Sequence, residues 1–503
     1  MRRDNLYTSM FFRSFLLSFV LGCLVGSPAL RAEDGSADWG RVMFVGDSIT
    51  HGINTPSYRW DFHKILVDNG IRYEEAGYTT GNFQRGKGNG VNLAPDSYRG
   101  VAFQNRHSAH EGGQIWQLFE EENTEYHQQA SGIHYSTKSG VKYPGQTIDA
   151  LAKQHRADTY CVLLGTNDII QNFHEGGSLG QGNNLTQALR GILGATAKGK
   201  GFRFNGKGTL DTLTDTLLSE KATKRVVVMG LIPPGRSKFT PADHTAVAAF
   251  NRALEAWAQQ KEHVLYAPLG EGTVDVAATP ADPYGAVEGK NQRVDWIHPG
   301  PQTNLIMAGN LAAALGCQGR TLGLTRQGSF TTGGTKLRKI TGGGSWNAPI
   351  QPAQDGSVTL LLDGLQVGNG YGDSAWNTRD ALSVTLDTGR QQGTLCISES
   401  YITWGKDLIL FSRDMSKNTD ALRVVYTAGD AAQGVEAGFY VWLGTRLIGE
   451  ACPAAPGSGK PGVSVSYNGK EGCRSGVLWA AAGAFAPAPA PKKQHLTEKR
   501  KKS

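Results

Sequence analysis

The chain has 503 residues, which is too long for one ordinary domain, so we expect two domains with terminal extensions. With 39% hydrophobic and 19% charged residues, it has the composition of a soluble globular protein. The net charge of +7 comes from the ends: residues 1–32 carry +3 and residues 491–503 carry +5, which leaves −1 for the body. A near-neutral body gives no support to nucleic-acid binding.

Residues 1–32 have the pattern of a signal peptide: Arg2 and Arg3 are followed by an apolar run at residues 14–25 and then by small residues. We therefore predict export, to the outside or to the periplasm and cell envelope. The apolar run of twelve residues is too short to span a bilayer, so we expect no transmembrane span. The residues before Cys23 also weakly resemble a lipoprotein processing site, which leaves lipid attachment as an alternative.

Residues 33–317 alternate between strand-like and helix-like segments. This alternation predicts a flavodoxin-like three-layer α/β/α sandwich, with helices on both faces of a parallel sheet. In such sheets the active site lies beyond the carboxyl ends of the strands. Short apolar runs bounded by turns predict strands at residues 41–45, 72–76, 160–164, 225–229 and 264–267.

Helices are predicted between these strands. One follows the first strand at residues 58–67, and another, at residues 302–315, is led by Pro299 and Pro301. The clearest has apolar side chains at spacings of three and four that fall on one helical face: Val247, Phe250, Leu254 and Trp257.

Three stretches, at about residues 79–106, 121–145 and 171–210, exceed ordinary connection lengths and are rich in Gly, Asn, Ser and Lys. Long loops at the carboxyl end of a strand often shape a substrate cleft. Plain surface insertions are the alternative.

From residue 325 to 480 the helical periodicity is absent, and short strand-like runs alternate with turns. This texture predicts a β-rich accessory domain, with a β-sandwich as the expected architecture. Its clearest strands are at residues 357–362, 382–386, 422–426 and 438–443. Residues 481–503 are Pro/Ala-rich and then basic, so we expect a flexible tail that could touch an anionic envelope surface.

Five cysteines remain after export, and their spacing has no metal-site pattern. Cys161 lies in an apolar strand and is expected in the core. Cys452 and Cys473 could form a disulfide in an oxidising compartment.

Residues 42–50, VMFVGDSIT, begin as an apolar strand, and this strand runs directly into Gly46-Asp47-Ser48. A serine at this junction would expose its hydroxyl at the edge of the sheet, and its backbone N–H could help to hold an oxyanion near a helix start. The alternative interpretation is that Asp47 or Ser48 merely caps a helix.

Two later segments carry complementary chemistry. Leu163–Asp168 places Asn167 at the end of another strand, where its side chain could donate to a developing negative charge; an ordinary strand-end turn is the alternative. Asp295-Trp296-Ile297-His298 precedes the last helix, so His298 could take the serine proton while Asp295 orients the imidazole.

These segments resemble the first, third and fifth sequence blocks of the SGNH (GDSL-like) hydrolase family, in the family's order. Residues 107–115, HSAHEGGQI, resemble the second block in the HEGHSGWTI form found in carbohydrate O-acetylesterases. Ser57-Tyr58-Arg59 and Leu66 also resemble that subgroup. The similarity covers about residues 40–316.

The resemblance implies an SGNH hydrolase domain at residues 33–317, with Ser48 as nucleophile and His298 as the base that Asp295 orients. It implies an oxyanion hole formed by the N–H groups of Ser48 and Gly112 and the side chain of Asn167. Gly113 could replace Gly112, because the block departs from the family at Ser108, Ala109 and Glu111. No metal or organic cofactor is implied.

Two other motifs are weaker. Residues 176–180, GGSLG, match the G-x-S-x-G elbow, but no strand leads directly into them. The second Gly-Asp-Ser, at residues 372–374, lies in the β-rich region without a following helix and is interpreted as a turn.

The resemblance, the export signal and the β-rich region favour a secreted acetylesterase acting on polysaccharide or on sialic-acid or mucin-type glycans. The alternatives are a lipolytic esterase or thioesterase, and a glycan-binding surface protein with a vestigial hydrolase site. In the latter case sugars would stack on aromatic side chains; buried core aromatics are the other interpretation of the same residues. The candidates are Trp346, Tyr371, Trp376 and Trp404.

Overall fold

The structure is a computed structural model. It describes residues 38–109, 111–113, 115, 118, 148–167, 209–232, 241–273, 297–317, 319–320, 322, 335–339, 344–367, 382–399, 401–405, 408–467 and 473–483. The predicted signal peptide with Cys23, the GGSLG motif, the second Gly-Asp-Ser and most of the predicted tail lie outside these residues.

The sheet of the amino-terminal half has seven strands, and the five predicted strands, which are parallel to one another, are confirmed. Their order is β2-β1-β9-β10-β11, the flavodoxin-like order in which two halves of the sheet grow outward from the first strand. Their bounds are β1 Asp38–Gly46, β2 Arg72–Ala76, β9 Thr159–Leu163, β10 Arg225–Met229 and β11 Val264–Ala267. Strands β9 and β10 are buried along their whole length, which explains their apolar sequences.

The long segment at residues 79–106 is built of short strands. β8 (Arg106–Ala109) pairs in parallel with the end of β1, and β3 (Thr79–Thr80) pairs antiparallel with β8. Two small hairpins lie between them: β4 (Asn82–Gln84) with β5 (Gly88–Val91), and β6 (Ser97–Tyr98) with β7 (Val101–Ala102).

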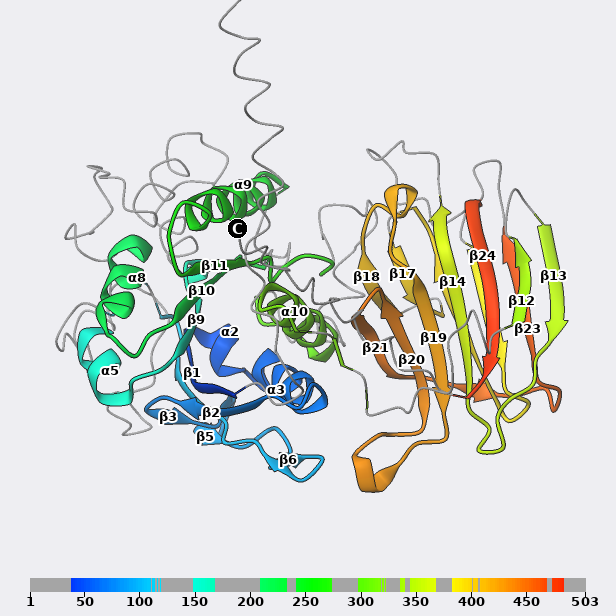
Figure 1. The fold of residues 1–503 in the computed structure, drawn as a ribbon, viewed down its shortest axis with the longest axis horizontal. Helices are drawn as coiled ribbons and strands as arrows, with labels where there is room; N and C mark the ends of the chain where they lie inside the picture. Colours follow the sequence, from blue (N-terminus) through cyan, green and yellow to red (C-terminus); the bar gives the residue numbers. More distant parts are fainter. Residues whose placement is uncertain are drawn as a thin grey trace, which may run out of the picture.

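The helices cover both faces of the parallel sheet: α3 and α10 lie on one side, and α5 and α8 on the other (Figure 1). The bounds are α2 Ser48–His51, α3 Tyr58–Asp68, α5 Ile148–His155, α8 Leu210–Ser219, α9 Pro241–Ala258 and α10 Pro301–Ala314. The predicted apolar face of α9 is confirmed: Val247, Phe250 and Leu254 are buried and Trp257 is partly buried. No helix among the described residues is long and apolar enough to cross a membrane.

The carboxy-terminal half, here called the β region (residues 335–483), contains two antiparallel sheets. The first has the order β12 Thr335–Lys339, β24 Cys473–Ala482, β14 Val358–Val367, β19 Leu422–Thr427, β20 Gly438–Leu443 and β21 Arg446–Cys452. The second has the order β13 Gly344–Pro349, β23 Gly462–Tyr467, β15 Leu382–Asp387, β16 Gln391–Ile397, β17 Tyr401–Trp404 and β18 Leu408–Ser412, with β22 Ala455–Pro456 beside β16. Short 3-10 turns lie at Met415–Lys417 and Ala431–Gln433.

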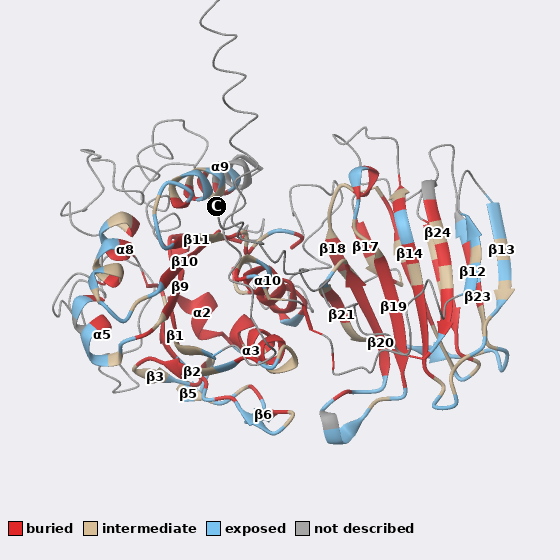
Figure 2. Ribbon diagram, viewed as in Figure 1, coloured by how far each residue is buried: buried red, intermediate tan, exposed pale blue. Residues whose placement is uncertain are grey.

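One hydrophobic core lies between the two sheets of the β region. It joins Leu360 and Val424 of the first sheet to Val384 and Leu395 of the second. Strands β19 and β20 are buried along their whole length, whereas the outer strands β12 and β13 are largely exposed (Figure 2). The last strand, β24, continues two residues beyond the predicted boundary at residue 480.

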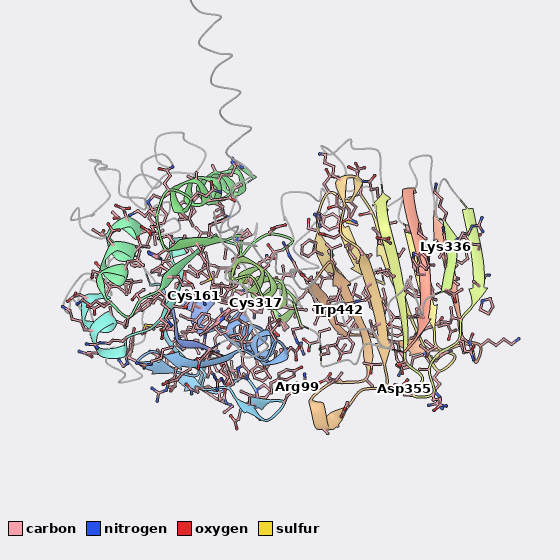
Figure 3. The ribbon with its side chains drawn as sticks, viewed as in Figure 1. Arg99, Cys161, Cys317, Lys336, Asp355 and Trp442 are labelled. Atoms are coloured by element: carbon pink, nitrogen blue, oxygen red, sulfur yellow. The ribbon has the colours of Figure 1, made fainter. Side chains whose placement is uncertain are left out.

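The cysteine predictions have mixed outcomes. Cys161 is fully buried on β9, so the core prediction is confirmed; Figure 3 places it within the parallel-sheet half. The suggested bridge between Cys452 and Cys473 is wrong, because Cys452 is a buried free thiol. Cys452 ends β21 and Cys473 begins β24, and three strands separate these two in the sheet. Four strand spacings of about 4.8 Å are far beyond the reach of a disulfide.

The aromatic core interpretation is confirmed for Trp404. This side chain is 5% exposed, packs on Phe439 and donates its indole N–H to the carbonyl of Pro453, so no ring face is offered to a sugar. Trp346 packs partly buried on the core, with the guanidinium of Arg338 5.6 Å from its ring centroid. The other two candidates, Tyr371 and Trp376, lie outside the described residues.

Replacing Phe44 by Ala should destabilise the protein, because this fully buried ring packs edge-on against both Tyr58 and Phe62 at the centre of the parallel-sheet core. We expect a loss of about 3–5 kcal/mol in the free energy of unfolding, measured by urea denaturation. The control Val101→Ala, at a side chain that is 46% exposed, should change it by no more than about 0.5 kcal/mol. Equal effects of the two variants would contradict this assignment of the core.

Candidate active site

Ser48 lies where β1 ends and the short helix α2 begins. Asp47 caps this helix, and its carboxylate accepts the N–H of Ile49 at 2.9 Å. Capping by Asp47 leaves the Ser48 hydroxyl available for another partner. Gly46 is required by close packing, since a Cβ there would lie 2.2 Å from Thr50 Oγ1 and 3.0 Å from the carbonyl oxygen of Leu163.

That partner is His298, which comes 250 residues later in the chain: its Nε2 lies 2.9 Å from Ser48 Oγ. His298 precedes α10 by three residues, with Pro301 at the first helical position. A hydroxyl and an imidazole at this separation have the geometry of a nucleophile and its base. The predicted orienting residue, Asp295, lies outside the described residues.

Asn167 reaches the same edge of the sheet because β1 and β9 are parallel and in register. Gly46 lies opposite Leu163, so both strands end at one level and the residues after them are neighbours. The Asn167 side-chain amide donates to Asp47 Oδ2 and to the carbonyl of Gly113, both at 3.3 Å. Asn167 thus lies beside the turn at residues 46–51, which carries the candidate nucleophile Ser48 and is here called the nucleophile turn.

The segment at residues 111–113 reaches the site through β8, whose residue Ala109 lies opposite Gly46. Gly112 has a φ of +66°, a left-handed conformation that favours glycine. Gly113 follows and offers its carbonyl to Asn167. Both candidate glycines therefore lie close to the turn that carries Ser48.

Asp47 is a fully buried carboxyl group at the centre of this arrangement. Burial raises its pKa to about 7, although the hydrogen bond from the Ile49 N–H acts in the opposite direction. Its two oxygens bind Ile49 and Asn167, so Asp47 links the nucleophile turn to the end of β9.

A network of buried polar side chains donates hydrogen bonds to the backbone of the nucleophile turn. The guanidinium of Arg59, which is 1% exposed, donates to the carbonyl of Thr50 at 2.9 Å and to Asn105 Oδ1 at 2.8 Å. Asn82 donates to the carbonyl of His51 at 2.8 Å and accepts from Asn105. These side chains satisfy the carbonyls of α2, which is too short to satisfy them itself.

Sequence reasoning assigned no role to this network. The Arg59 signal was visible in the Ser57-Tyr58-Arg59 run, in which the Tyr58 hydroxyl also binds Thr50 Oγ1 at 3.1 Å. Asn82 and Asn105 come from the long Asn-rich segment at residues 79–106. That segment is therefore not a plain surface insertion, because residues at its two ends, Asn82 and Asn105, belong to the network that holds the turn with Ser48.

A second contact ties the segment at residues 111–113 to the nucleophile turn. Glu111 Oε1 lies 2.9 Å from Nδ1 of His51, three residues after Ser48, and the His51 side chain is fully buried. The His107 ring lies 4.8 Å from the His51 ring; its Nδ1 accepts the Ala109 N–H, so its Nε2 donates to the carbonyl of Gly81. Glu111 is one of the residues at which the second block departs from the family pattern.

Among the described residues no group of three His, Cys, Asp or Glu side chains gathers as metal ligands would. The side chains that do gather are a hydroxyl, an imidazole and an amide donor. Together they can transfer a proton from serine and hold an anion beside it.

Glu75, on β2 next to this network, should make stability depend on pH. The side chain is 2% exposed, and burial raises its pKa to about 7, against the lowering effect of the Arg59 charge. The folded state then keeps a proton that the unfolded state loses above about pH 4.5. The contribution of the Glu75 carboxyl group to the free energy of unfolding is therefore fully present below pH 4.5, and it is lost as the pH rises through about 7.

In Glu75→Gln this pH dependence should disappear. The free energy of unfolding of wild type relative to the variant should fall between pH 4.5 and 7.5, by at most about 3 kcal/mol at 1.36 kcal/mol per pKa unit. Urea denaturation at the two pH values measures this difference. Glu74→Gln, at a side chain that is 57% exposed, is the control and should give a constant difference. A constant difference for Glu75→Gln too would show that its carboxyl group titrates normally.

Glu111→Ala should slow turnover without weakening substrate binding, because it releases the segment at residues 111–113 from His51. We expect kcat on p-nitrophenyl acetate to fall about tenfold, less than the 10²–10³ lost with an oxyanion donor itself, and KM to stay within about twofold. Glu74→Ala is the matched control. An unchanged kcat in Glu111→Ala would mean that the contact with His51 does not hold the segment in place.

No curated protein sequence matches the chain. Two of the solved structures that resemble it are Axe2, an acetylxylan esterase from Geobacillus stearothermophilus, and LAE5, an alpha/beta hydrolase enzyme from the metagenome of Lake Arreo, Spain. Axe2 is 14% identical with a TM-score of 0.27, over 56% of this chain and 95% of its own. LAE5 is 11% identical with a TM-score of 0.27, over 56% of this chain and 97% of its own.

A family match covers most of the parallel-sheet half. Residues 42–311 match the family described as GDSL-like Lipase/Acylhydrolase, from the strand before Ser48 to the helix after His298. This range is more than half of the chain and includes every described residue of the site. The chain therefore belongs to the GDSL-like lipase/acylhydrolase family and is a carboxylic ester hydrolase.

Proposed function

We propose that this hydrolase is a secreted serine esterase that removes O-acetyl groups from carbohydrates through an acyl-serine intermediate. The observation that carries the proposal is the 2.9 Å contact between Ser48 Oγ and His298 Nε2 at the carboxyl edge of the parallel sheet. Both groups belong to sequence blocks that resemble those of the SGNH hydrolases, and the second block, at residues 107–115, resembles the carbohydrate-esterase form.

In the proposed reaction Ser48 Oγ attacks the acetyl carbonyl carbon while His298 Nε2 takes the hydroxyl proton. The tetrahedral intermediate collapses, and the imidazolium returns this proton to the leaving sugar oxygen. Water then attacks the acetyl-serine ester with His298 again as the base, which releases acetate and restores the Ser48 hydroxyl. Asp295 would orient the imidazole and stabilise its charged form. These steps use protein side chains and water alone.

The oxyanion of each intermediate would be held by the N–H groups of Ser48 and Gly112 and by the Asn167 amide. The left-handed backbone at Gly112 and the position of Asn167 beside Asp47 support this assignment. The Asn167 amide nitrogen lies 3.3 Å from Asp47 Oδ2 and 3.3 Å from the Gly113 carbonyl oxygen, so these two hydrogen bonds are long. Gly113 is the alternative donor.

The proposed acyl group is acetyl because the second block resembles the carbohydrate-esterase form and the insertions around the site are polar. Polysaccharides and sialic-acid or mucin-type glycans are both candidate substrates. A lipolytic esterase or thioesterase remains the competing function.

The remaining proposals concern architecture and location. We propose that the two antiparallel sheets of the β region form a β-sandwich, supported by the core that their facing strands share. The amino-terminal signal supports export to the cell surface, the periplasm or the medium, and the basic tail would contact an anionic envelope. A β region that binds glycan alone, with a vestigial hydrolase site, is the alternative from another class.

The test compares hydrolysis of the acetate, butyrate and octanoate esters of p-nitrophenol by the mature protein and by Ser48→Ala. We expect acetate to be the best substrate, with kcat reduced at least about 10⁴-fold in the variant. Acetate release from acetylated xylan and from acetylated sialic acid then identifies the glycan. Preference for octanoate would replace the proposal by a lipolytic function, and folded protein that turns over none of these esters would favour the vestigial-site alternative.

A further inference from the structure

The helix that follows His298 belongs to two hydrophobic cores. On one side α10 packs Met307, Ala308 and Leu311 into the core of the parallel sheet. On the other side Ile306 enters the core of the β region, and Leu305 packs in a cluster that includes Trp442. Figure 1 shows α10 lying between the parallel sheet and the strands of the β region. The helix therefore cannot shift relative to the β region without disturbing both cores.

The first turn of α10 depends on the β region for its hydrogen bonds. Gln302, four residues after His298, is 7% exposed, and its Nε2 donates to the carbonyl of Leu410 on β18 at 2.9 Å and to that of Ile448 on β21. A buried amide is costly without partners, and here both acceptors are backbone atoms of the β region. Strands β18 and β21 thus both contact α10 in its first turn, four residues after His298.

The loop after β11, from which the chain runs through residues 274–296 to His298, is held by the β region too. The Ser412 N–H on β18 donates to the carbonyl of Gly272 at 3.0 Å. A Cβ on Gly272 would lie 1.9 Å from the ring of Phe411, so the two chains are in direct contact there. Arg446 of β21 binds Asn310 Oδ1 at 3.0 Å, and Asn310 donates to three carbonyls of the same loop.

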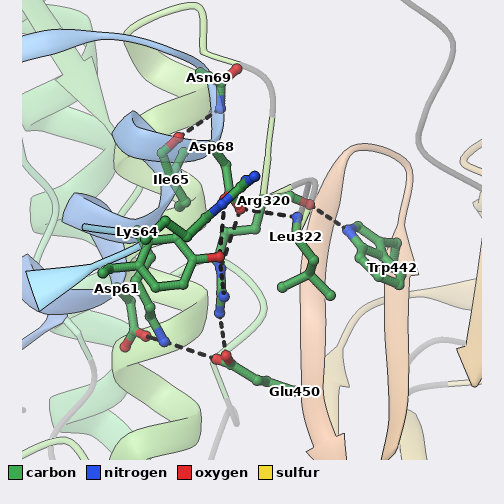
Figure 4. A network of polar contacts seen from close by, with 11 residues as sticks. Asp61, Lys64, Ile65, Asp68, Asn69, Arg320, Leu322, Trp442 and Glu450 are labelled. Carbon is green, nitrogen blue, oxygen red and sulfur yellow. Dashed lines mark hydrogen bonds and ion pairs between the residues drawn. The ribbon is translucent and has the colours of Figure 1, made fainter. Parts of the chain in front are cut away.

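A separate set of contacts fastens the β region to α3, away from His298. Arg320, 1% exposed, binds Glu450 of β21 and lies 3.6 Å from Asp68 of α3, while Lys64 binds Glu450 at 3.0 Å (Figure 4). Although burial raises it, the charges of Arg320 and Lys64 hold the pKa of Glu450 at about 2. The indole N–H of Trp442 donates to the Arg320 carbonyl (Figure 4).

We propose that the β region is a positioning element of the active site: β18 and β21 hold the first turn of α10 and the loop after β11, and thereby keep His298 against Ser48. Gln302 is its main positioning residue. The inference rests on the proposed role of His298, and it gives the β region a task in the hydrolytic step that needs no binding of glycan. Its two sets of contacts predict different consequences when they are broken.

The first test replaces Gln302 by Met, which keeps the length of the side chain but removes both hydrogen bonds to the β region. The matched control is Lys64→Met, which breaks the contact to Glu450 on the α3 side. Both variants should lower Tm. Only Gln302→Met should lower kcat on p-nitrophenyl acetate, by at least about tenfold, with KM within about twofold, because small displacements of a catalytic base cost up to about 10²-fold. Equal kcat in the two variants would overturn the proposal.

A second pair of variants, at Gly272 and Gly356, tests the positioning role of the β region if Gln302→Met does not fold. Gly272 and Gly356 have similar backbone angles, with φ of +75° and +80°, but a Cβ meets the Phe411 ring at Gly272 and nothing within 4 Å at Gly356. Gly272→Ala and Gly356→Ala therefore share the backbone strain and differ in contact with β18. We expect kcat to fall about tenfold in Gly272→Ala alone. An unchanged kcat in Gly272→Ala overturns the proposal.

A readout that needs no ester substrate separates this inference from the proposed function. The rate at which a fluorophosphonate labels Ser48 depends on activation of the hydroxyl by His298, not on the acyl group that the site accepts. Wild type that labels but releases no acetate would contradict only the proposed substrate, and slower labelling of Gln302→Met would still support the positioning role. Wild type that neither labels nor hydrolyses would overturn both.

Discussion

The candidate site depends first on the parallel pairing of β1 with β9. Gly46 lies opposite Leu163, so the two strands end at the same level and the residues that follow them meet at one edge of the sheet. This register is strongly specified, because β9 and the last five residues of β1 are buried, and a slip by one residue would exchange the faces of all their side chains. Ser48 and Asn167, 119 positions apart in the sequence, become neighbours as a result.

The nucleophile turn creates a local problem that the surrounding segments solve. A helix of four residues cannot satisfy its own backbone carbonyls, and α2 is buried along its length. Arg59 and Asn82 supply the missing donors from α3 and β4. Burial lowers the pKa of Arg59, yet the guanidinium still binds carbonyl and amide oxygens that water cannot reach. The geometry at Ser48 is therefore maintained by residues that contact no substrate in the proposed reaction.

The imidazole side of the site has a different origin. His298 is presented by α10, a helix whose surface is divided between the parallel sheet and the β region. The junction combines apolar packing with ion pairs of a buried guanidinium: Arg320, which is 1% exposed, lies between Asp68 and Glu450. Buried charges without partners are strongly destabilising, so the junction favours one arrangement of the two halves. The hydroxyl and the imidazole thus belong to separately supported parts of the fold.

The sequence by itself determined the parallel strands, the apolar face of α9, the family and the proximity of Ser48, Asn167 and His298 to one sheet edge. Strand patterns and motifs can be recognised locally in the sequence. The carboxyl ends of parallel strands lie at the same edge of the sheet, whatever the conformation of the loops that follow them. Only the tertiary structure decided that Cys452 and Cys473 lie four strand positions apart, that Trp404 is buried, and that Glu111 meets His51. The support of α10 by Gln302 was equally invisible in the sequence. Each of these depends on contacts between segments distant in the chain, and no local pattern encodes which strands become neighbours.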